Sequence, residues 1–228
     1  MIDMNMPRSF RAQCLSGLIV VLLLPYSVAA QESRNGPKIG IDIGTQTAGQ
    51  FLSWYGLPKL GFIAGWSFEA PLTSQVSLLI EPMYIGKGSV NVNSQLKTRG
   101  SVALNYLELP LMLKVSTNPD PQGLFLCGGL MYGYFLFGKV RNYQDGTLVS
   151  AYDYSPSDNT HRSQFSAALG IGHEKGHWMW ELRGQSSLNT FEAIQRSHNV
   201  VYSLQVAWRF STNSEREKKR SAQEDDQN

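Results

Sequence analysis

The feature that most constrains this chain is an alternation of apolar and polar residues that runs from Lys38 to Phe210. Alternation with a period of two predicts β-strands and not helices. About eight such segments, each of roughly ten residues, follow one another; they lie near 38–48, 60–70, 76–88, 102–115, 123–138, 163–174, 177–189 and 199–210. This length matches the ~9–11 residues with which a tilted strand crosses a bilayer. The chain is therefore expected to be an all-β protein.

The first 30 residues have the composition of a secretory signal peptide. Arg8 and Arg11 precede an apolar stretch, Leu15–Leu24, and small residues lead up to Ala30. This order predicts cleavage after Ala30. The apolar stretch is shorter than the ~20 residues of a spanning helix, so a retained anchor helix is the less favoured alternative. Residues 31–37 are then expected to form an N-terminal linker.

Composition excludes some classes of protein. The formal net charge of +2 argues against a nucleic-acid partner, which usually requires a concentrated basic face. Cys127 is alone after the predicted cleavage site, so an intramolecular disulfide is excluded. Past the signal, the sequence has no apolar run long enough for a spanning helix. A mature protein that spans a membrane would have to do so as a closed barrel, because open sheet edges stay unsatisfied in lipid.

Alternation alone is compatible with a soluble sandwich or barrel, whose apolar residues face inward, and with a membrane barrel, whose apolar residues face lipid. The placement of aromatic residues favours the membrane barrel. They gather near the ends of the predicted strands, where Trp and Tyr form girdles at the two interfaces. The predicted aromatic girdle consists of Tyr84, Tyr106, Trp178, Trp180, Tyr202, Trp208 and Phe210. An aromatic core is the alternative.

The polar faces of the predicted strands also favour a membrane barrel. Carboxylates and guanidinium groups lie mid-strand among glycines and serines, and an eight-stranded barrel has an interior just wide enough for its side chains. Buried ions of this kind are tolerated when they satisfy one another. The predicted polar network of the lumen consists of Glu69, Glu81, Glu108, Glu181, Arg183 and Arg209. Scattered surface charges are the alternative.

Short and long connections alternate along the chain. Short turns are predicted at 70–75, 116–122 and 173–177, and longer polar loops at 47–59, 88–101, 139–162 and 190–199. Outer-membrane barrels have short periplasmic turns and longer outer loops. The sequence therefore predicts an eight-stranded antiparallel up-and-down transmembrane β-barrel over 38–210, located in the cell outer membrane with its lipid as a partner. The loop 139–162 is the predicted contact surface for protein partners.

The last segment, 211–228, contains five acidic and four basic residues and no large apolar residue. Such a composition cannot bury enough surface to offset its ordering entropy. A disordered charged periplasmic tail is expected, with a short docking peptide for a protein partner as the alternative.

No catalytic, cofactor or metal site is predicted. His173 and His177 have the spacing of metal ligands on a helix, but they flank a predicted turn. Asp158, His161 and Ser163 lie close together at the predicted outer rim. They leave a rim-site hydrolase or acyltransferase as a minor alternative.

Two motifs carry a family resemblance. Glu81-Pro82-Met83-Tyr84 is followed by Gly86-Lys87-Gly88, and a second strand contains Asn105-Tyr106-Leu107-Glu108-Leu109-Pro110-Leu111. In these motifs the chain resembles the outer-membrane β-barrel domain proteins of Bacteroidetes, often called porin family or PorT family, over about Ile39 to Phe210.

The resemblance implies a barrel similar to those of OmpX and OmpA, with a final-strand aromatic residue that the outer-membrane insertion machinery recognises. Phe210 is that residue here, although eighteen residues follow it. Most members of the family have no established activity. The resemblance therefore implies a structural or surface-interaction protein with at most limited passage of small solutes, and alternatively a PorT-like accessory factor for protein secretion.

Overall fold

Strand β1 (Arg34–Ala48) closes the sheet into a ring, because it pairs antiparallel with β2 (Trp54–Pro71) on one side and with β10 (Ser197–Trp208) on the other. The computed structural model describes residues 33–48, 54–119, 122–154, 162–190 and 197–211. The other members of the ring are β3 (Val76–Ile80) with β4 (Met83–Asn93), β5 (Thr98–Ser116), β6 (Gly123–Gln144), β8 (Ser163–Lys175) and β9 (Trp178–Ser187).

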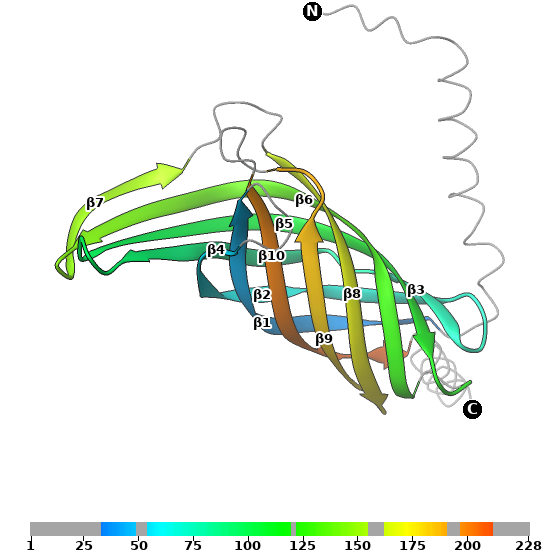
Figure 1. Cartoon of the computed structure of the whole chain (residues 1–228). Helices are drawn as coiled ribbons and strands as arrows, with labels where there is room; N and C mark the ends of the chain where they lie inside the picture. Colours follow the sequence, from blue (N-terminus) through cyan, green and yellow to red (C-terminus); the bar gives the residue numbers. More distant parts are fainter. Residues whose placement is uncertain (1–32, 49–53, 120–121, 155–161, 191–196, 212–228) are drawn as a thin grey trace, which may run out of the picture.

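Every neighbouring pair in the ring is antiparallel, and consecutive strands are neighbours. With β3 and β4 counted as one interrupted strand, the described ring has eight strands (Figure 1). The predicted eight-stranded antiparallel barrel is therefore confirmed. Within the described residues, no helix is long and apolar enough to cross a membrane.

The outer surface of the ring is apolar. Along β5, the leucines at 107, 109, 111 and 113 are about half exposed, whereas Tyr106, Glu108 and Lys114 are buried. The other strands repeat this arrangement, with Ile39, Ile41 and Ile43 outside on β1. A continuous apolar belt of this size is not found on a soluble monomer. It is the surface that a barrel presents to lipid.

The ring contains two local departures from the sequence prediction. The expected single strand 76–88 is interrupted at Glu81 and Pro82, because proline lacks the N–H that a strand ladder requires. Residues 34–37 of the expected linker 31–37 are strand: β1 begins at Arg34, which pairs with Glu69 on β2 and with Ser211 on the short strand β11 (Phe210–Ser211). The predicted signal peptide 1–30 and tail residues 212–228 lie outside the described residues.

The largest difference concerns the loops expected at 88–101 and 139–162. There β4, β5 and β6 continue beyond the ring, and β7 (Thr147–Tyr154) pairs with β6. These extensions, residues 89–105 and 137–154, form a four-stranded projection that we call the arm; it extends to the left of the ring in Figure 1. The end of the ring that carries the arm is called the arm end, and the opposite end, which has the short turns near 72–75 and 176–177, the turn end.

Candidate functional site

The middle of the barrel contains four charged side chains that satisfy one another. Lys38 Nζ donates to Glu81 at 2.8 Å and to Glu181 at 2.6 Å. Arg183 donates to Glu81 at 2.5 Å and to Glu181 at 2.6 Å. All four side chains are fully enclosed, so each ion has exchanged water for oppositely charged partners. We call these residues the central cluster.

A second charged cluster lies nearer the turn end. Lys114 pairs with Glu69 at 2.9 Å and also with Glu174, Arg209 pairs with Glu69, and Arg34 pairs with Glu174 at 2.9 Å. The hydroxyl of Ser67 joins this cluster to the central cluster. It donates to Glu81 at 2.8 Å and accepts a hydrogen bond from Arg209 at 3.2 Å. One connected network therefore runs from Arg34 to Arg183.

A third group lies nearer the arm end. Lys87 Nζ contacts Glu108 at 2.5 Å and donates to Gln164 at 2.6 Å, and Gln185 donates to Glu108 at 3.2 Å. Asp42 is buried nearby, and within the described residues neither of its carboxylate oxygens has a hydrogen-bond partner.

The described interior is balanced in charge. It contains six basic and six acidic residues: Arg34, Lys38, Lys87, Lys114, Arg183 and Arg209, with Asp42, Glu69, Glu81, Glu108, Glu174 and Glu181. All six residues of the predicted lumen network lie here. The prediction omitted Arg34, Lys38, Asp42, Lys87, Lys114 and Glu174. The alternation of inward and outward residues along each strand could have found most of them. Lys114 and Glu108, for example, are both even-numbered and fall on the same face of β5.

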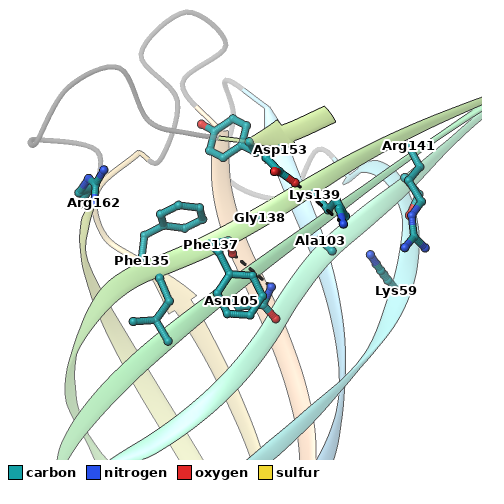
Figure 2. Close-up of a pocket in the computed structure, with 13 residues that line it drawn as sticks. Lys59, Ala103, Asn105, Phe135, Phe137, Gly138, Lys139, Arg141, Asp153 and Arg162 are labelled. Carbon is teal, nitrogen blue, oxygen red and sulfur yellow. Dashed lines mark hydrogen bonds and ion pairs between the residues drawn. The ribbon is translucent and has the colours of Figure 1, made fainter. Parts of the chain in front are cut away.

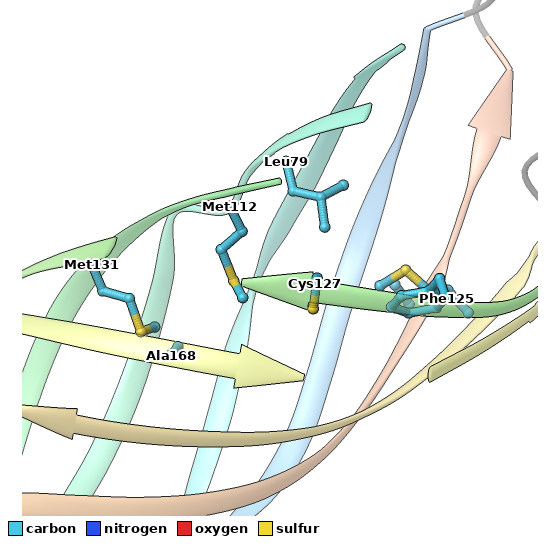
Figure 3. Close-up of a cluster of buried hydrophobic side chains, with 8 residues drawn as sticks. Leu79, Met112, Phe125, Cys127, Met131 and Ala168 are labelled. Carbon is cyan, nitrogen blue, oxygen red and sulfur yellow. The ribbon is translucent and has the colours of Figure 1, made fainter. Parts of the chain in front are cut away.

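Apolar side chains fill the space between the charged groups. One cluster consists of Leu79, Met112, Phe125, Cys127, Met131, Ala168, Met179 and Ala207, most of which Figure 3 shows. The other consists of Ile63, Met83, Ile85, Leu104, Tyr106, Phe135 and Val201. The ring thus has an apolar exterior and an interior made of both charged and apolar layers.

Tyr106 is a correction to the predicted aromatic girdle. It is 1 % exposed and meets Phe135 edge to face inside the barrel, at 5.6 Å between ring centroids. The reason is the alternation of side chains along β5: Tyr106 lies on the same inward face as Glu108, and the residue between Tyr106 and Glu108, Leu107, faces outward. Its position near the end of a predicted strand was therefore misleading.

The other predicted girdle residues lie on the outer face. At the turn end, Trp178 stands edge to face with Trp208 at 4.6 Å and stacks with Trp180 at 6.3 Å. Phe210 and Tyr202 are exposed on the same outer surface, and Tyr84 is partly covered, its hydroxyl donating to Asn105 at 2.5 Å. Trp and Tyr side chains have an apolar ring with one polar group, which suits them to the membrane interface.

Potential catalytic or metal-binding groups are held in structural contacts. His177 Nδ1 is hydrogen-bonded to the carbonyl oxygen of Arg209 at 2.8 Å, and its ring stacks on Trp208. The Cys127 thiol donates to Glu181 at 3.3 Å. The part of the chain that the structure describes has no group of three metal-ligating side chains. Of the predicted rim residues, Ser163 hydrogen-bonds to Tyr132 at 3.0 Å, whereas Asp158 and His161 lie outside the described residues.

The arm contains two adjoining hollows of about 580 and 610 Å³ that share Lys59, Ser101 and Arg141. Figure 2 shows the first, with Lys59 and Arg141 at one end and Arg162 at the other. Six basic residues line the two hollows: Lys59, Lys97, Arg99, Lys139, Arg141 and Arg162. Asp153 is the one acidic residue among the described lining residues. The lining of the two hollows is therefore strongly basic.

The comparison with protein families agrees with the architecture. Residues 29–192 match the family described as outer membrane protein beta-barrel domain. The comparison with curated proteins finds no match. Among solved structures, the chain is similar to Ail of Yersinia pestis in complex with the heparin analogue sucrose octasulfate, with a TM-score of 0.48, 12 % identity, and coverage of 79 % of this chain and 100 % of that one.

It is also similar to Neisserial surface protein A (TM-score 0.45, 10 % identity, 78 % and 99 % coverage) and to OprG of Pseudomonas aeruginosa (TM-score 0.37, 10 % identity, 78 % and 94 % coverage). These likenesses concern the fold alone. The family match spans well over half of the chain, and the closed antiparallel ring with its apolar exterior is the structure that such a family requires. The chain therefore belongs to the outer membrane protein β-barrel domain family.

Proposed function

We propose that this outer-membrane barrel is a surface-interaction protein, with a lumen that passes small solutes poorly at most and an arm that makes the contacts outside the cell. The observation that carries the proposal is the filled interior. Paired charges run from Arg34 to Arg183, and the apolar cluster around Tyr106 lies beyond them. An eight-stranded ring leaves room for little else.

Passage of an ion would require the central cluster to open. Each of its four members contacts two oppositely charged groups, so one displaced side chain removes one of the two ion pairs of each of its two partners. A buried ion without its partner costs about 3–5 kcal/mol. The closed state is therefore strongly favoured, and the apolar layers beside it offer an ion no replacement ligands.

The arm supports the second half of the proposal. Short turns are periplasmic in barrels of this kind, so the arm end faces outward from the cell. Leu148, Val149 and Tyr152 are all at least half exposed on β7, which within the described residues pairs with β6 alone. An exposed strand edge with apolar side chains is a surface suited to protein contact.

Planar-bilayer recording tests the closed lumen. We expect no stable unitary currents from the folded protein. As a positive control, the variant with Lys38, Glu81, Glu181 and Arg183 all changed to serine keeps the lumen neutral and empties its middle, so we expect it to conduct. Unitary currents of equal size from both proteins would reject the proposal.

No described residue favours the two alternatives. The PorT-like secretion role depends on the tail, of which 212–228 lie outside the described residues, and the rim-site enzyme depends on Asp158 and His161, which lie outside them as well. Deleting 212–228 should leave barrel folding and secretion unchanged if the arm is the interaction surface.

A further inference from the structure

Two basic residues of the arm, Lys139 and Arg141, owe their direction to a β-bulge in β6. In the ring, the odd-numbered residues of β6 point inward, as Phe135 does. Tyr106 pairs with Phe135, but its neighbour Asn105 pairs with Phe137, so Leu136 is an extra residue. A bulge re-aims the side chains that follow it. Beyond Leu136, the odd-numbered residues of β6 therefore point to the outer side of the sheet.

Strand β5 shows which side this is. It is continuous, and its outward leucines at 107–113 share their face with Asn105, Ala103, Ser101 and Arg99. Lys139 pairs with Ala103 and Arg141 with Ser101, so these two basic residues lie on that face as well. The surface that meets lipid along the ring thus continues onto the arm, where it becomes basic.

The cations on this surface outnumber the carboxylates that could neutralise them. Lys97 is 3.8 Å from Asp145, and Lys139 is 4.0 Å from Asp153. Within the described residues, no carboxylate pairs with the remaining four, Lys59, Arg99, Arg141 and Arg162. Lys59 Nζ donates to the carbonyl oxygen of Val102 at 3.1 Å and lies within electrostatic range of Arg141. Two like charges held close together are relieved by an anion bound between them.

The apolar residues of the first hollow indicate where this anion comes from. Phe137 and Leu136 are exposed at the start of the arm, next to the lipid-facing belt, and Lys139 and Arg141 follow further out. Along the arm, apolar residues are followed by cations. A membrane interface has the same sequence of layers, because acyl chains are followed by charged headgroups. A soluble anion would need the cations but not their continuity with the lipid-facing surface.

We propose that this face of the arm binds the phosphate groups of lipids in the outer leaflet. Arg141, Lys59 and Lys139 would hold phosphate through charge-assisted hydrogen bonds, and Phe137 would lie against the acyl region. The inference rests on the proposed function, because it takes the arm to lie outside the cell. It adds a ligand to that assignment: phosphorylated lipid anchors one face of the arm, and β7 stays available for a protein partner.

The test uses lipid A, which has two phosphates, as the probe. Native mass spectrometry of the full folded protein in detergent gives the affinity by titration. The double variant Lys139→Gln/Arg141→Gln removes two charges, each worth about fivefold at a membrane surface, so lipid A should bind about 25-fold more weakly. Lys175→Gln, the same kind of change at the turn end, should bind as the unchanged protein does. Heat-modifiable gel migration verifies that each variant is folded.

Two comparisons identify the ligand. Dephosphorylated lipid A should bind about as weakly to the unchanged protein as lipid A does to the double variant, and inositol hexakisphosphate, a soluble polyanion, should not displace lipid A at matched phosphate concentration. Equal affinity of the double variant and the unchanged protein would overturn the inference, as would full displacement by the soluble polyanion. Bilayer recordings on the double variant distinguish this inference from the proposal of a closed lumen. The two substitutions leave the interior of the barrel unaltered, so the lumen should stay closed whether or not lipid A binds.

Discussion

Replacing Glu81 with leucine should lower the free energy of unfolding by about 3–5 kcal/mol, the largest effect expected of a single substitution in this barrel. Glu81 accepts hydrogen bonds from Lys38, Arg183 and Ser67 in a fully enclosed site. Leucine fills a similar volume but leaves two cations facing Glu181 alone. Denaturant titration of the protein folded into lipid vesicles measures the loss, with gel migration as the readout of the folded fraction.

A double-mutant cycle distinguishes lost pairing from lost packing. Adding Lys38→Met to Glu81→Leu removes one charge of each sign and leaves Arg183 paired with Glu181. Since a balanced cluster tolerates apolar replacement, the double variant should recover most of the stability that the single variant loses. If the two substitutions were simply additive, the central cluster would not be held by its ion pairs.

Replacing Gly36 with alanine should cost about 3 kcal/mol, at the upper end of the range for overpacked sites. Gly36 lies on β1 where β10 ends and β11 begins, and a Cβ there would overlap the carbonyl oxygen of Trp208. The next residue, Arg209, lies on the inner face of the sheet and contacts Glu69 and Ser67. The three nearest atoms all belong to the backbone of Trp208 and Arg209, which cannot rotate away as a side chain could.

The matched control is Gly86→Ala, because the nearest atom to a Cβ at Gly86 is Asn105 Oδ1 at 3.7 Å. That variant should be as stable as the unchanged protein or gain about 0.4–1 kcal/mol from the reduced freedom of its unfolded chain. The same vesicle titration compares the two. A loss at Gly86 equal to that at Gly36 would show that the barrel resists any added side chain, and that the approach of Trp208 is not the cause.

The sequence could predict which residues face the interior wherever inward and outward residues alternate regularly along a strand. Glu108 and Lys114 are both inward because they share a face of β5, and the same rule places Tyr106 inside, where the position of strand ends had indicated the girdle. The pairing of charges could not be predicted. Lys38 and Glu181 are 143 residues apart in sequence, and they meet at 2.6 Å only because the ring closes.

The arm is the part of the fold that was missed. Its strands mix apolar and polar residues without a sustained alternation, as the adjacent exposed residues Leu148 and Val149 illustrate, so most of the arm reads as loops. They are strands because their neighbours extend hydrogen-bonding ladders beyond the ring, as Ser101 with Arg141 illustrates. A strand that depends on its neighbours for stability has no local signal.

The sequence by itself determined that this chain would form a closed eight-stranded ring with an apolar outside, because alternating faces and a lack of long apolar helical runs leave no other way to span a membrane. Tertiary structure alone decided two features. Ring closure chose which charges pair, and the bulge at Leu136 turned Lys139 and Arg141 toward the outer face. Each depends on contacts between residues on different strands, and such contacts exist only once the register of the strands is set.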